Sequence, residues 1–556
     1  MQYSISRTSD VSQFIQVQLD IQCDSIGKVD LQLPLWRPGR YEFQHFAQKI
    51  RGLYVDHLGS KVPTYKKNKS CWQFEAHQPG RYSIHYEFYA NQMDAGGCWS
   101  DDEQLYLNFS NFCFEVSGKS EESIAIQIDL PENYNIATSL PNHDGCFIAS
   151  NYQHLIDSPF MSGRNMSKTS YQVGDITFHM CFLGKVCFDM EHLVRIFTAF
   201  TERQLKAFGE LPIKDYYFLF QLLPYKHYHG VEHGASTVIT FGPAVDLAQK
   251  SGLNELIGVS SHELYHAWNV CRIRPTALLP YDLSQEAYID EGLVLEGVTT
   301  YMGDLYLLKS GYFQLEDYLK ILQVQLQKEM DHWGWQNQSI TASSWDLWLD
   351  GYKAGIPDKK VSIYNRGALI SLCLDLMLIK AGSSLEQVMY TMWNNYGQQN
   401  KGYVLRGFQQ IVGAHLKDEK EAEQFFSSFV YGREDLLSLL ITLLAEFGIK
   451  ASLQFDHSPL LNLFGIKTDG DTTIVKVHHE SDAFQKIMIG DTILFSSDIA
   501  ESAIGEKNGQ VLNLKIKRYG REIDVSLHQP FQKPKYFPTV LIHVVSSNHL
   551  REIWSR

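Results

Sequence analysis

Two histidines four residues apart, with a glutamate between them, form the segment His262-Glu263-Leu-Tyr-His266. The surrounding run 256–270 has the period of a helix, so both imidazoles lie on one helical face with Cβ atoms about 6 Å apart. Two neutral imidazoles on one face bind Zn²⁺ well. Glu263 points towards the position that the metal leaves open, where a carboxylate accepts a proton from water. The pattern therefore predicts metallopeptidase chemistry, with Glu263 as the general base.

A catalytic zinc needs a third protein ligand, and a carboxylate from a following helix supplies it when no third histidine is suitably spaced. Three glutamates follow His266 by 20, 25 and 30 positions: Glu286, Glu291 and Glu296. Spacing by itself favours Glu286. Glu286 and Glu291, however, flank an expected helix start, where acidic residues commonly only complement the helix dipole. Glu296 lies mid-helix among apolar residues, where a carboxylate is costly unless a metal or another partner neutralises it. Burial therefore favours Glu296.

The elements that must position these residues differ along the chain. Residues 1–168 repeatedly alternate apolar and polar residues with period two, which puts one face of each strand into a core. Turn pairs such as Pro38-Gly39 separate the clearest runs, which are 15–21, 29–35, 82–88 and 124–130. The sequence therefore predicts an N-terminal antiparallel, sandwich-like β domain.

Residues 169–452 have longer segments of helical period. Two strand-like runs, 216–223 and 236–241, come early in this region. Helical segments follow at 256–270, 293–308, 315–330, 368–379 and 436–447. Gly448 comes directly after the last segment and is expected to end it. This region predicts a mostly helical domain, and the whole chain is expected to be a multidomain α+β protein.

Residues 453–530 return to strand-like runs, and Tyr519-Gly520 forms a turn between the last two. These runs are 463–467, 473–477, 492–495, 512–517 and 523–527, with a helical piece at 481–487. The terminal residues 531–556 show no period and are expected to form a tail.

The composition excludes several functional classes. The chain has 49 basic and 63 acidic residues among 556, so its formal net charge is 49 − 63 = −14, and this field repels nucleic acids and acidic membranes. The 44% of hydrophobic residues indicates a globular chain rather than a disordered one. No apolar run approaches the roughly 20 residues of a spanning helix.

The expected compartment follows from the N-terminus and the cysteines. The first seven residues lack the basic start and apolar core of a secretory signal. Nine cysteines without a Cys-x-x-Cys pair give neither a disulfide framework nor a cysteine-based zinc site. A cytoplasmic location is therefore expected.

Several longer motifs carry a family resemblance over nearly the whole chain. They are His262-Glu-Leu-Tyr-His-Ala-Trp-Asn-Val-Cys-Arg-Ile-Arg-Pro275, Tyr281-Asp282, Glu296-Gly-Val-Thr-Thr-Tyr-Met-Gly-Asp-Leu305, Leu33-Pro-Leu-Trp-Arg-Pro-Gly-Arg-Tyr41, Gly230-Val-Glu-His233, Tyr364-Asn-Arg-Gly367 and the segment from Leu461. Together they resemble the glycyl aminopeptidase family of zinc peptidases, which carry a C-terminal PDZ domain. Departures are small: Cys271 stands where a basic residue is common, and Met302 where a second aromatic is common. None removes a ligand, so we expect an active enzyme.

The resemblance implies a β domain (1–168), a thermolysin-like zinc peptidase domain (169–452) and a PDZ domain (453–530), in the order that periodicity gives. It places the third ligand of one Zn²⁺ per chain at Glu296, in agreement with the burial argument. Asn269, Thr300 and Asp304 are equal candidates for orienting the ligands, because a histidine ligand usually donates its other nitrogen's proton to an acceptor.

Two further residues have a chemical interpretation and a simpler structural one. The phenol of Tyr364 donates a hydrogen bond to the developing oxyanion, or Tyr364 merely packs. Glu232 grips the free α-amine of a substrate, or it is a solvated acid among His227, His229 and His233. The family's motifs favour the chemical interpretation of both residues.

Leu463-Phe-Gly-Ile466 and Ile489-Gly-Asp491 resemble the carboxylate-binding loop and Gly-Asp turn of PDZ domains, which capture peptide C-termini. A degenerate module without a ligand is the alternative.

Three functional hypotheses follow. The first is a zinc aminopeptidase that removes small N-terminal residues, glycine or alanine, from peptides with a free N-terminus. The second is a PDZ-guided endopeptidase or quality-control protease, and the third is a catalytically silent PDZ scaffold. A homo-oligomer is compatible with all three.

Overall fold

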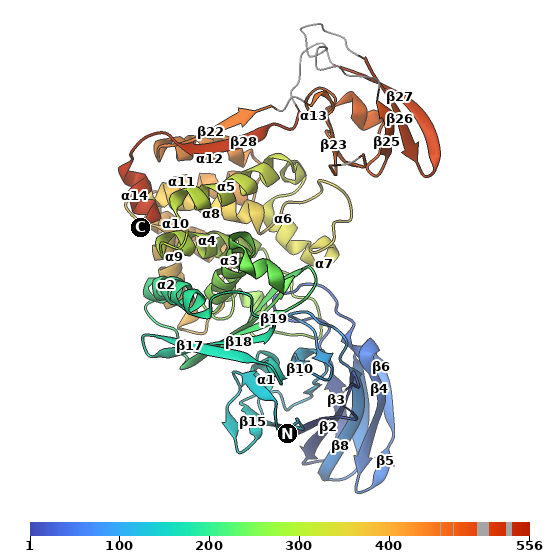
Figure 1. Cartoon of the computed structure of the whole chain (residues 1–556). Coiled ribbons are helices and arrows are strands. Elements are labelled where there is room, and N and C mark those ends of the chain that lie inside the picture. Colours follow the sequence, from blue (N-terminus) through green and yellow to red (C-terminus); the bar gives the residue numbers. More distant parts are fainter. Residues whose placement is uncertain (10, 456–457, 471, 497–510, 530–535) are drawn as a thin grey trace. The chain divides into compact units, whose positions relative to one another are not determined.

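The computed structural model describes residues 1–9, 11–455, 458–470, 472–496, 511–529 and 536–556 (Figure 1). The chain divides into two compact units. The first comprises residues 1–318, 334–436 and 552–556, and the second comprises residues 319–333 and 437–551. The predicted domain boundary at 530–531 lies outside the described residues, and the other predicted boundaries stay predictions.

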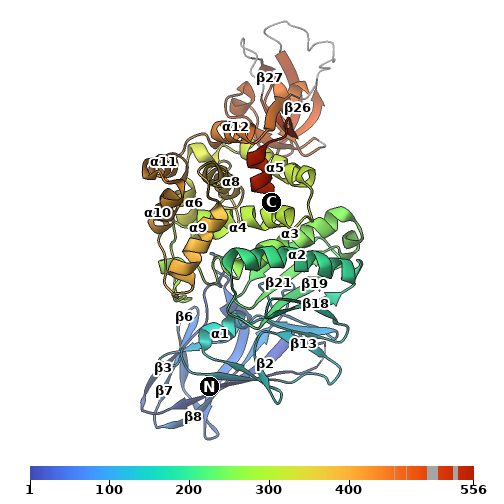
Figure 2. The ribbon, with the colours of Figure 1, turned by 90° about the vertical axis from the view of Figure 1, so that its left-hand side faces the viewer.

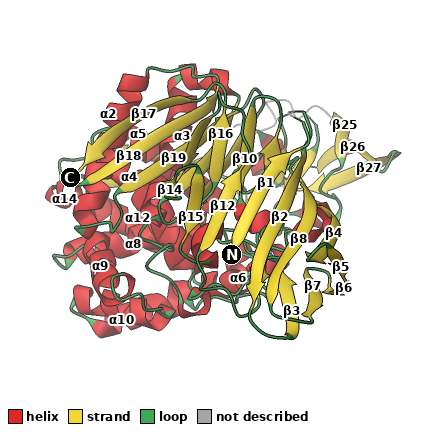
Figure 3. Cartoon of the chain, turned by 90° about the horizontal axis from the view of Figure 1, so that it is seen from below, coloured by secondary structure: helices red, strands yellow, loops and turns green. Residues whose placement is uncertain are grey.

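The N-terminal residues of the first unit form β-sheets, which Figure 3 shows as yellow arrows. An eight-stranded sheet has the order β14-β15-β12-β1-β2-β8-β4-β5. Its strands are Asn142–His143, Cys146–Ala149, Ile124–Ile128, Gln2–Arg7, Phe14–Cys23, Gly80–Tyr89, Ile50–His57 and Ser60–Val62. The predicted alternation is confirmed, since Ile15, Val17, Leu19 and Ile21 of β2 are all at most 2% exposed.

Two four-stranded sheets complete this region. One joins β13 (Asn135–Thr138), β16 (Phe160–Gly163), β10 (Gln104–Leu107) and β9 (Trp99–Ser100). The other joins β11 (Glu115–Val116), β3 (Gly27–Gln32), β7 (Cys71–Ala76) and β6 (Thr64–Asn68). The short helices η1 (Phe46–Lys49), η2 (Phe109–Asn111) and α1 (Tyr152–Ile156) lie between strands.

The prediction of a wholly antiparallel N-terminal domain is wrong in one place. Strand β1 pairs with β12 in parallel, with Tyr3 opposite Ile126. More than a hundred residues separate the two strands, and only a long connection allows the chain to return in the same direction. Sequence alternation does not contain strand direction, because a strand buried on one face alternates in either pairing.

A five-stranded sheet and two helices position the chemistry. The sheet order is β17-β18-β19-β21-β20, from Ser167–Val173, Ile176–Gly184, Asp215–Leu222, Ser236–Gly242 and His227–Glu232. Figure 2 shows α2 (Met190–Phe208) and α3 (Lys250–His266) on one side of this sheet and the N-terminal strands on the other. Strand β20 pairs only with β21 in the described residues and therefore forms an edge.

The predicted helix 293–308 consists of two parts. Leu293–Val298 is a π-helix (η5), and Thr299–Lys309 is the α-helix α4. A π-turn holds one extra residue per hydrogen-bonded turn and changes the direction of the side chains, which is why such turns recur at functional sites. Glu296 lies inside this turn. Apolar periodicity does not distinguish a π-turn from an α-helix, so the sequence showed only a helix.

Helices continue the first unit around α8 (Asn365–Lys380), which is buried along almost its whole length. The others are η3 (Ala244–Ala248), η4 (Thr276–Leu278), η6 (Gly334–Gln336), α6 (Ile340–Trp345), α7 (Leu347–Asp350), α9 (Leu385–Met392), η7 (Trp393–Gly397), α10 (Leu405–Leu416), α11 (Glu419–Phe425) and η8 (Phe426–Val430). Among the described residues, no helix on its own has the length and hydropathy to cross a bilayer. Helix α8 and the segment α9–η7 pass this test only when they are taken together, and the two are bent by 103° relative to each other.

The second unit contains most of α5 (Leu315–Met330) and α12 (Leu436–Glu446), and a small β region. That region has α13 (Pro459–Asn462), β23 (Ile466–Thr468), β24 (Ile474–Val477), η9 (Asp482–Gln485), β25 (Thr492–Ser496), β26 (Val511–Arg518) and β27 (Arg521–His528). The predicted strand 463–467 is wrong at its start. Helix α13 precedes it, and Gly465 turns the chain with a φ of +67°.

The terminal residues without a recognisable period contain a strand and a helix. Strand β28 (Thr539–Val544) pairs antiparallel with β22 (Ile449–Gln454), and α14 (His549–Ser555) follows. Strand β22, the pairing partner of β28, is about 90 residues away in sequence, so the local pattern does not reveal β28. Gly448, predicted to end a helix, has a φ of +70° directly after α12, which agrees with its expected role.

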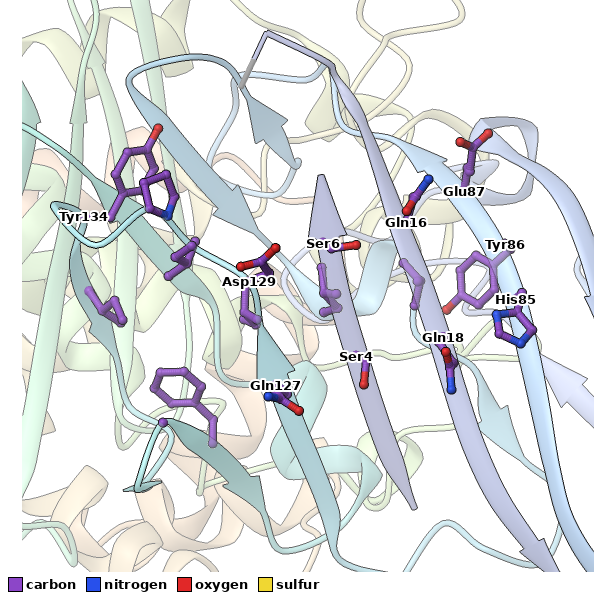
Figure 4. A pocket seen from close by; sticks show the side chains of 18 of the residues that line it. Ser4, Ser6, Gln16, Gln18, His85, Tyr86, Glu87, Gln127, Asp129 and Tyr134 are labelled. Carbon is purple, nitrogen blue, oxygen red and sulfur yellow. The ribbon is translucent and has the colours of Figure 1, made fainter. Parts of the chain in front are cut away.

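A hollow of about 850 Å³ lies on the outer face of the eight-stranded sheet (Figure 4). Its walls include uncharged polar side chains from adjacent strands, among them Ser4, Ser6, Gln16, Gln18 and Gln127. Polar residues are expected on the solvent face of a half-buried sheet. None of the histidine and carboxylate clusters described below includes a residue of this hollow.

The helix crossing beside Glu296 depends on two glycines, and it generates a stability prediction. A Cβ on Gly297 would lie 2.5 Å from the Cα of Gly367 on α8, so Gly297→Ala forces two backbones apart. We expect this substitution to cost about 1–3 kcal/mol of unfolding free energy, measured by thermal or denaturant unfolding. Gly258→Ala, in the interior of α3 with open space around its Cβ, is the matched control and should stabilise by up to about 1 kcal/mol. Equal effects of the two substitutions would contradict the close-packing argument.

Candidate metal centre

Three predicted ligand side chains converge at one point of the first unit. The Nε2 atoms of His262 and His266 are 3.1 Å apart. The Oε2 atom of Glu296 lies 3.5 Å from His262 Nε2 and 3.4 Å from His266 Nε2. These three residues, from α3 and η5, form one of the clusters whose donor atoms could share a metal ion. Two imidazole nitrogens and a carboxylate oxygen are the donor set that Zn²⁺ takes in catalytic sites.

The carboxylate of Glu296 tests whether these residues fit a cation. Glu296 is only 7% exposed, and its Oε2 atom is buried with no hydrogen-bond donor in the described part of the chain. A buried carboxylate oxygen without a donor is costly unless a positive charge balances it. The residues therefore fit a metal ion.

The pKa values of the cluster show the same need for positive charge. Burial alone would raise the pKa of Glu296, but the neighbouring imidazoles of His266 and His262 hold it well below its usual range. Burial would lower the pKa of His266, but the charge of Glu296 outweighs this and raises it to about 10. Burial lowers the pKa of His262. Glu296 is therefore a permanent anion at neutral pH.

Contacts at the end of α3 fix the orientation of His266. Its Nδ1 lies 2.8 Å from the backbone carbonyl oxygen of Asn269, which accepts the Nδ1 proton and turns Nε2 towards the cluster. The Asn269 side chain donates to the carbonyl of Val294 at 2.7 Å and to the hydroxyl of Thr299 at 2.9 Å. Asn269, one of three candidates for orienting the ligands, therefore connects α3 to the turn that carries Glu296. The second of these contacts is with Thr299, the first residue of α4 and the neighbour of the predicted Thr300.

Glu263 lies on the same helix and faces strand β20. A Cβ on Gly230 would overlap the carboxylate of Glu263, so only glycine leaves room for it there. Burial raises the pKa of Glu263 well above its usual value, and its Oε2 has no hydrogen-bond donor among the described residues. A buried carboxylate with a raised pKa is a group that can take part in proton transfer.

Glu232, at the end of β20, completes a second group of donors. Oxygen atoms of Glu232 and Glu263 and a ring nitrogen of His266 lie within 4.8 Å of one another. Glu232 is 9% exposed, and no hydrogen bond or ion pair to its carboxylate is found among the described residues. It is therefore not the solvated acid of the simpler interpretation. His233, by contrast, is occupied by Asp157 at 3.1 Å.

Tyr364 lies at the same centre. Its hydroxyl donates a hydrogen bond to Oε1 of Glu296 at 3.2 Å, from the position just before α8. The side chain is 39% exposed, so it reaches the cluster from an accessible side. A residue that only fills a core would be more deeply buried.

The two other candidate ligands lie outside the cluster. The Glu291 carboxylate accepts hydrogen bonds from the backbone N–H groups of Leu405 at 3.1 Å and Asp290 at 2.9 Å. Glu286 is half-buried and belongs to no group of metal donors in the described chain. Sequence spacing favoured Glu286, but the distance along the chain does not account for the loop that precedes η5.

One group of residues near the centre had no functional assignment from sequence. Asp94 accepts from Nδ1 of His229 at 2.9 Å, and Arg37 lies 3.4 Å from Nε2 of the same ring. Because arginine only donates, Nε2 of His229 accepts in this contact and Nδ1 donates to Asp94. Asp94, His227 and His229 have the spacing of metal donors. The neighbouring guanidinium disfavours a cation there, so we assign this group to anchoring β20. In the sequence, only the alternation of His227 and His229 along β20 pointed to this group.

Family comparisons match two parts of the chain. Residues 2–164 match the peptidase M61 N-terminal domain, and residues 255–370 match the M61 glycyl aminopeptidase. No curated protein matches the chain at the threshold of significance.

Comparison with solved structures shows the fold. An aminopeptidase N family protein from Idiomarina loihiensis superposes with a TM-score of 0.89 at 24% sequence identity, covering 100% of both chains. An M1 zinc metallopeptidase from Deinococcus radiodurans gives a TM-score of 0.48 at 16% identity, over 78% of this chain and 94% of that one. The first match shows that the entire chain has the fold of a known protein.

Proposed function

Because the chain belongs to the M61 glycyl aminopeptidase family and is a zinc metallopeptidase of the aminopeptidase type, we propose that it removes single small residues, glycine or alanine, from the free N-termini of peptides. The observation that carries the proposal is the short distance between Glu232 and the cluster. Donor atoms of Glu232, Glu263 and His266 lie within 4.8 Å of one another, and one extended residue spans at most about 3.6 Å. A substrate amine at Glu232 therefore brings the first peptide bond to Glu263.

We assign the metal to His262, His266 and Glu296. The orphaned, buried Oε2 of Glu296 and the facing imidazole nitrogens support this assignment. When bound, Zn²⁺ polarises the scissile carbonyl and lowers the pKa of a water molecule to about 7. Asn269 keeps His266 in the tautomer that presents Nε2 to the site.

Glu263 is the proposed general base. It accepts the proton of the attacking water and passes it to the leaving amine, a role typically worth 10²–10⁴-fold in rate. Burial of its carboxylate and the open space that Gly230 leaves for it support this role.

Tyr364 is the proposed oxyanion donor. Its hydroxyl, now 3.2 Å from Glu296, turns to the carbonyl oxygen as negative charge develops there. The exposed side of Tyr364 supports contact with the substrate.

Glu232 is the proposed binding site for the substrate's α-amine. A free ammonium replaces the partner that the carboxylate lacks in the protein, with a charge-assisted hydrogen bond. Discrimination against blocked peptides follows, because an acetyl group would leave Glu232 buried and unpaired.

A second candidate function concerns the small β region of the second unit, which we propose to be a PDZ domain. Gly465 turns the chain before β23, and β23 pairs only with β24 among the described residues, so an edge is open for peptide addition. Asp491 of the Gly-Asp turn is held by Arg518 at 2.7 Å. A peptide-guided endopeptidase remains the alternative that this edge favours. The cytoplasmic location and the oligomeric state stay predictions of the sequence.

We predict that the purified protein contains about one zinc per chain and that Glu296→Gln weakens zinc binding by more than about 10²-fold. Loss of a direct ligand should exceed the 10–100-fold typical of an outer partner. Metal analysis by mass spectrometry and chelator titration measure this. Glu286→Gln is the control and should retain zinc, and the opposite pattern would reverse the ligand assignment.

Glu263→Gln should retain zinc and fold normally but lose at least about 10²-fold in turnover, because the amide cannot accept the proton from water. Steady-state kinetics on a glycyl peptide, paired with metal analysis, measure both quantities. Wild-type turnover in this variant would remove Glu263 from the mechanism.

Acetyl-glycyl peptides should be cleaved about 10²-fold less efficiently than glycyl peptides, because a charge-assisted hydrogen bond contributes about 1.5–3 kcal/mol. Glu232→Ala, and the isosteric Glu232→Gln, should remove most of this difference by slowing cleavage of the free-amine peptide, with zinc content unchanged. Comparison of kcat/KM for the two peptides measures it. Equal cleavage of both peptides by the wild-type enzyme would favour the endopeptidase alternative.

A further inference from the structure

A loop of the N-terminal β region, residues 35–41, is pinned to the peptidase residues of the same unit. It follows β3 and precedes η1. Four polar contacts hold it: Leu35 N–H to the Leu283 carbonyl (2.8 Å), Trp36 Nε1–H to the Gln285 carbonyl (2.8 Å), Arg37 to His229 (3.4 Å) and Tyr41 N–H to the Tyr352 hydroxyl (3.0 Å). Trp36 is fully buried and packs edge-on against Tyr281 and Trp348. The loop is therefore fixed at both ends and in its middle.

Gly39, inside this loop, touches the carboxylate of Glu232. A Cβ built on Gly39 would lie 2.5 Å from Oε2 and 2.8 Å from Oε1 of Glu232. The φ of Gly39 is +77°, a conformation that residues with a side chain rarely adopt. Because the loop is pinned, an added methyl group would displace the flexible end of Glu232 rather than the loop.

We propose that the loop 35–41 is the end wall of the amine site, and that Gly39 is the positioning residue that sets the place of the Glu232 carboxylate. This inference rests on the proposed function, in which Glu232 binds the substrate's free amine. The wall limits the space beyond Glu232, so the site accepts a compact ammonium group and excludes a preceding residue. The N-terminal β region therefore determines that the enzyme works from chain ends.

The test compares two glycines of the same region. Gly39→Ala adds a methyl group against Glu232. Gly59→Ala, between β4 and β5, imposes the same backbone strain at a φ of +80°, but its Cβ has open space within 4 Å. The probes are a glycyl peptide and its acetylated form, and the measurement is the ratio of their kcat/KM values, with zinc content and melting temperature for each variant.

Gly39→Ala should reduce the ratio at least about tenfold, through a raised KM for the glycyl peptide, and retain zinc. Gly59→Ala should keep the wild-type ratio while showing a similar fall in melting temperature, because only the strain is shared. A merely structural role of Gly39 would lower stability without changing the ratio. Equal ratios for the two variants would overturn the proposal.

Tyr352→Phe provides a second, milder variant. It removes the acceptor of the Tyr41 N–H group and adds no atom near Glu232. We expect a several-fold higher KM for the glycyl peptide. If Gly39→Ala does not fold, an unchanged ratio in Tyr352→Phe overturns the proposal.

The inference and the proposed function fail in different ways. A wild-type enzyme that cleaves both peptides equally contradicts the role of Glu232, and with it the wall. An enzyme that discriminates, loses discrimination in Glu232→Ala and keeps it in Gly39→Ala contradicts the wall alone.

Discussion

The convergence of two imidazoles and a carboxylate at a largely buried point constrains the rest of the first unit. Glu296 keeps its negative charge because the imidazoles of His266 and His262 lie next to it. Such a cluster persists only if α3 and η5 approach closely and do not move apart. Asn269 connects the two elements, and the contact between Gly297 and Gly367 lets α8 support the turn from behind. The π-turn at 293–298 then directs Glu296 at the histidines.

The N-terminal β region forms part of the site rather than a separate module. Asp94 and Arg37 hold the His229 ring on one face of β20, and the strand's opposite face carries Gly230 and Glu232 towards Glu263. Edge strands are otherwise exposed to unwanted pairing, and covering one with another region is a usual protection. In this chain the covering loop also brings Gly39 against the carboxylate of Glu232.

The full-length structural match supports the fold, whereas the residues of the site support the function. The match over the full length to an aminopeptidase N family protein has 24% identity and shows the architecture. A fold hosts many chemistries, so activity must be argued from the site. The family matches lie on the N-terminal region and on the residues around the metal cluster, and those residues carry the assignment to a zinc aminopeptidase. Peptide recognition by the second unit is a separate question, because β23 pairs only with β24 among the described residues.

The sequence by itself determined the local features. The i, i+4 spacing of His262 and His266 fixes a shared helical face, and the strand alternation of 15–21 fixes which residues are buried. The cost of burying a charge singled out Glu296, although spacing favoured Glu286. Tertiary structure decided what depends on residues distant in the chain. The parallel pairing of β1 with β12, the strand β28 and the contact of Gly39 with Glu232 all join segments separated by about 90 residues or more. Such contacts depend on the path of the whole chain, which neither period nor spacing encodes.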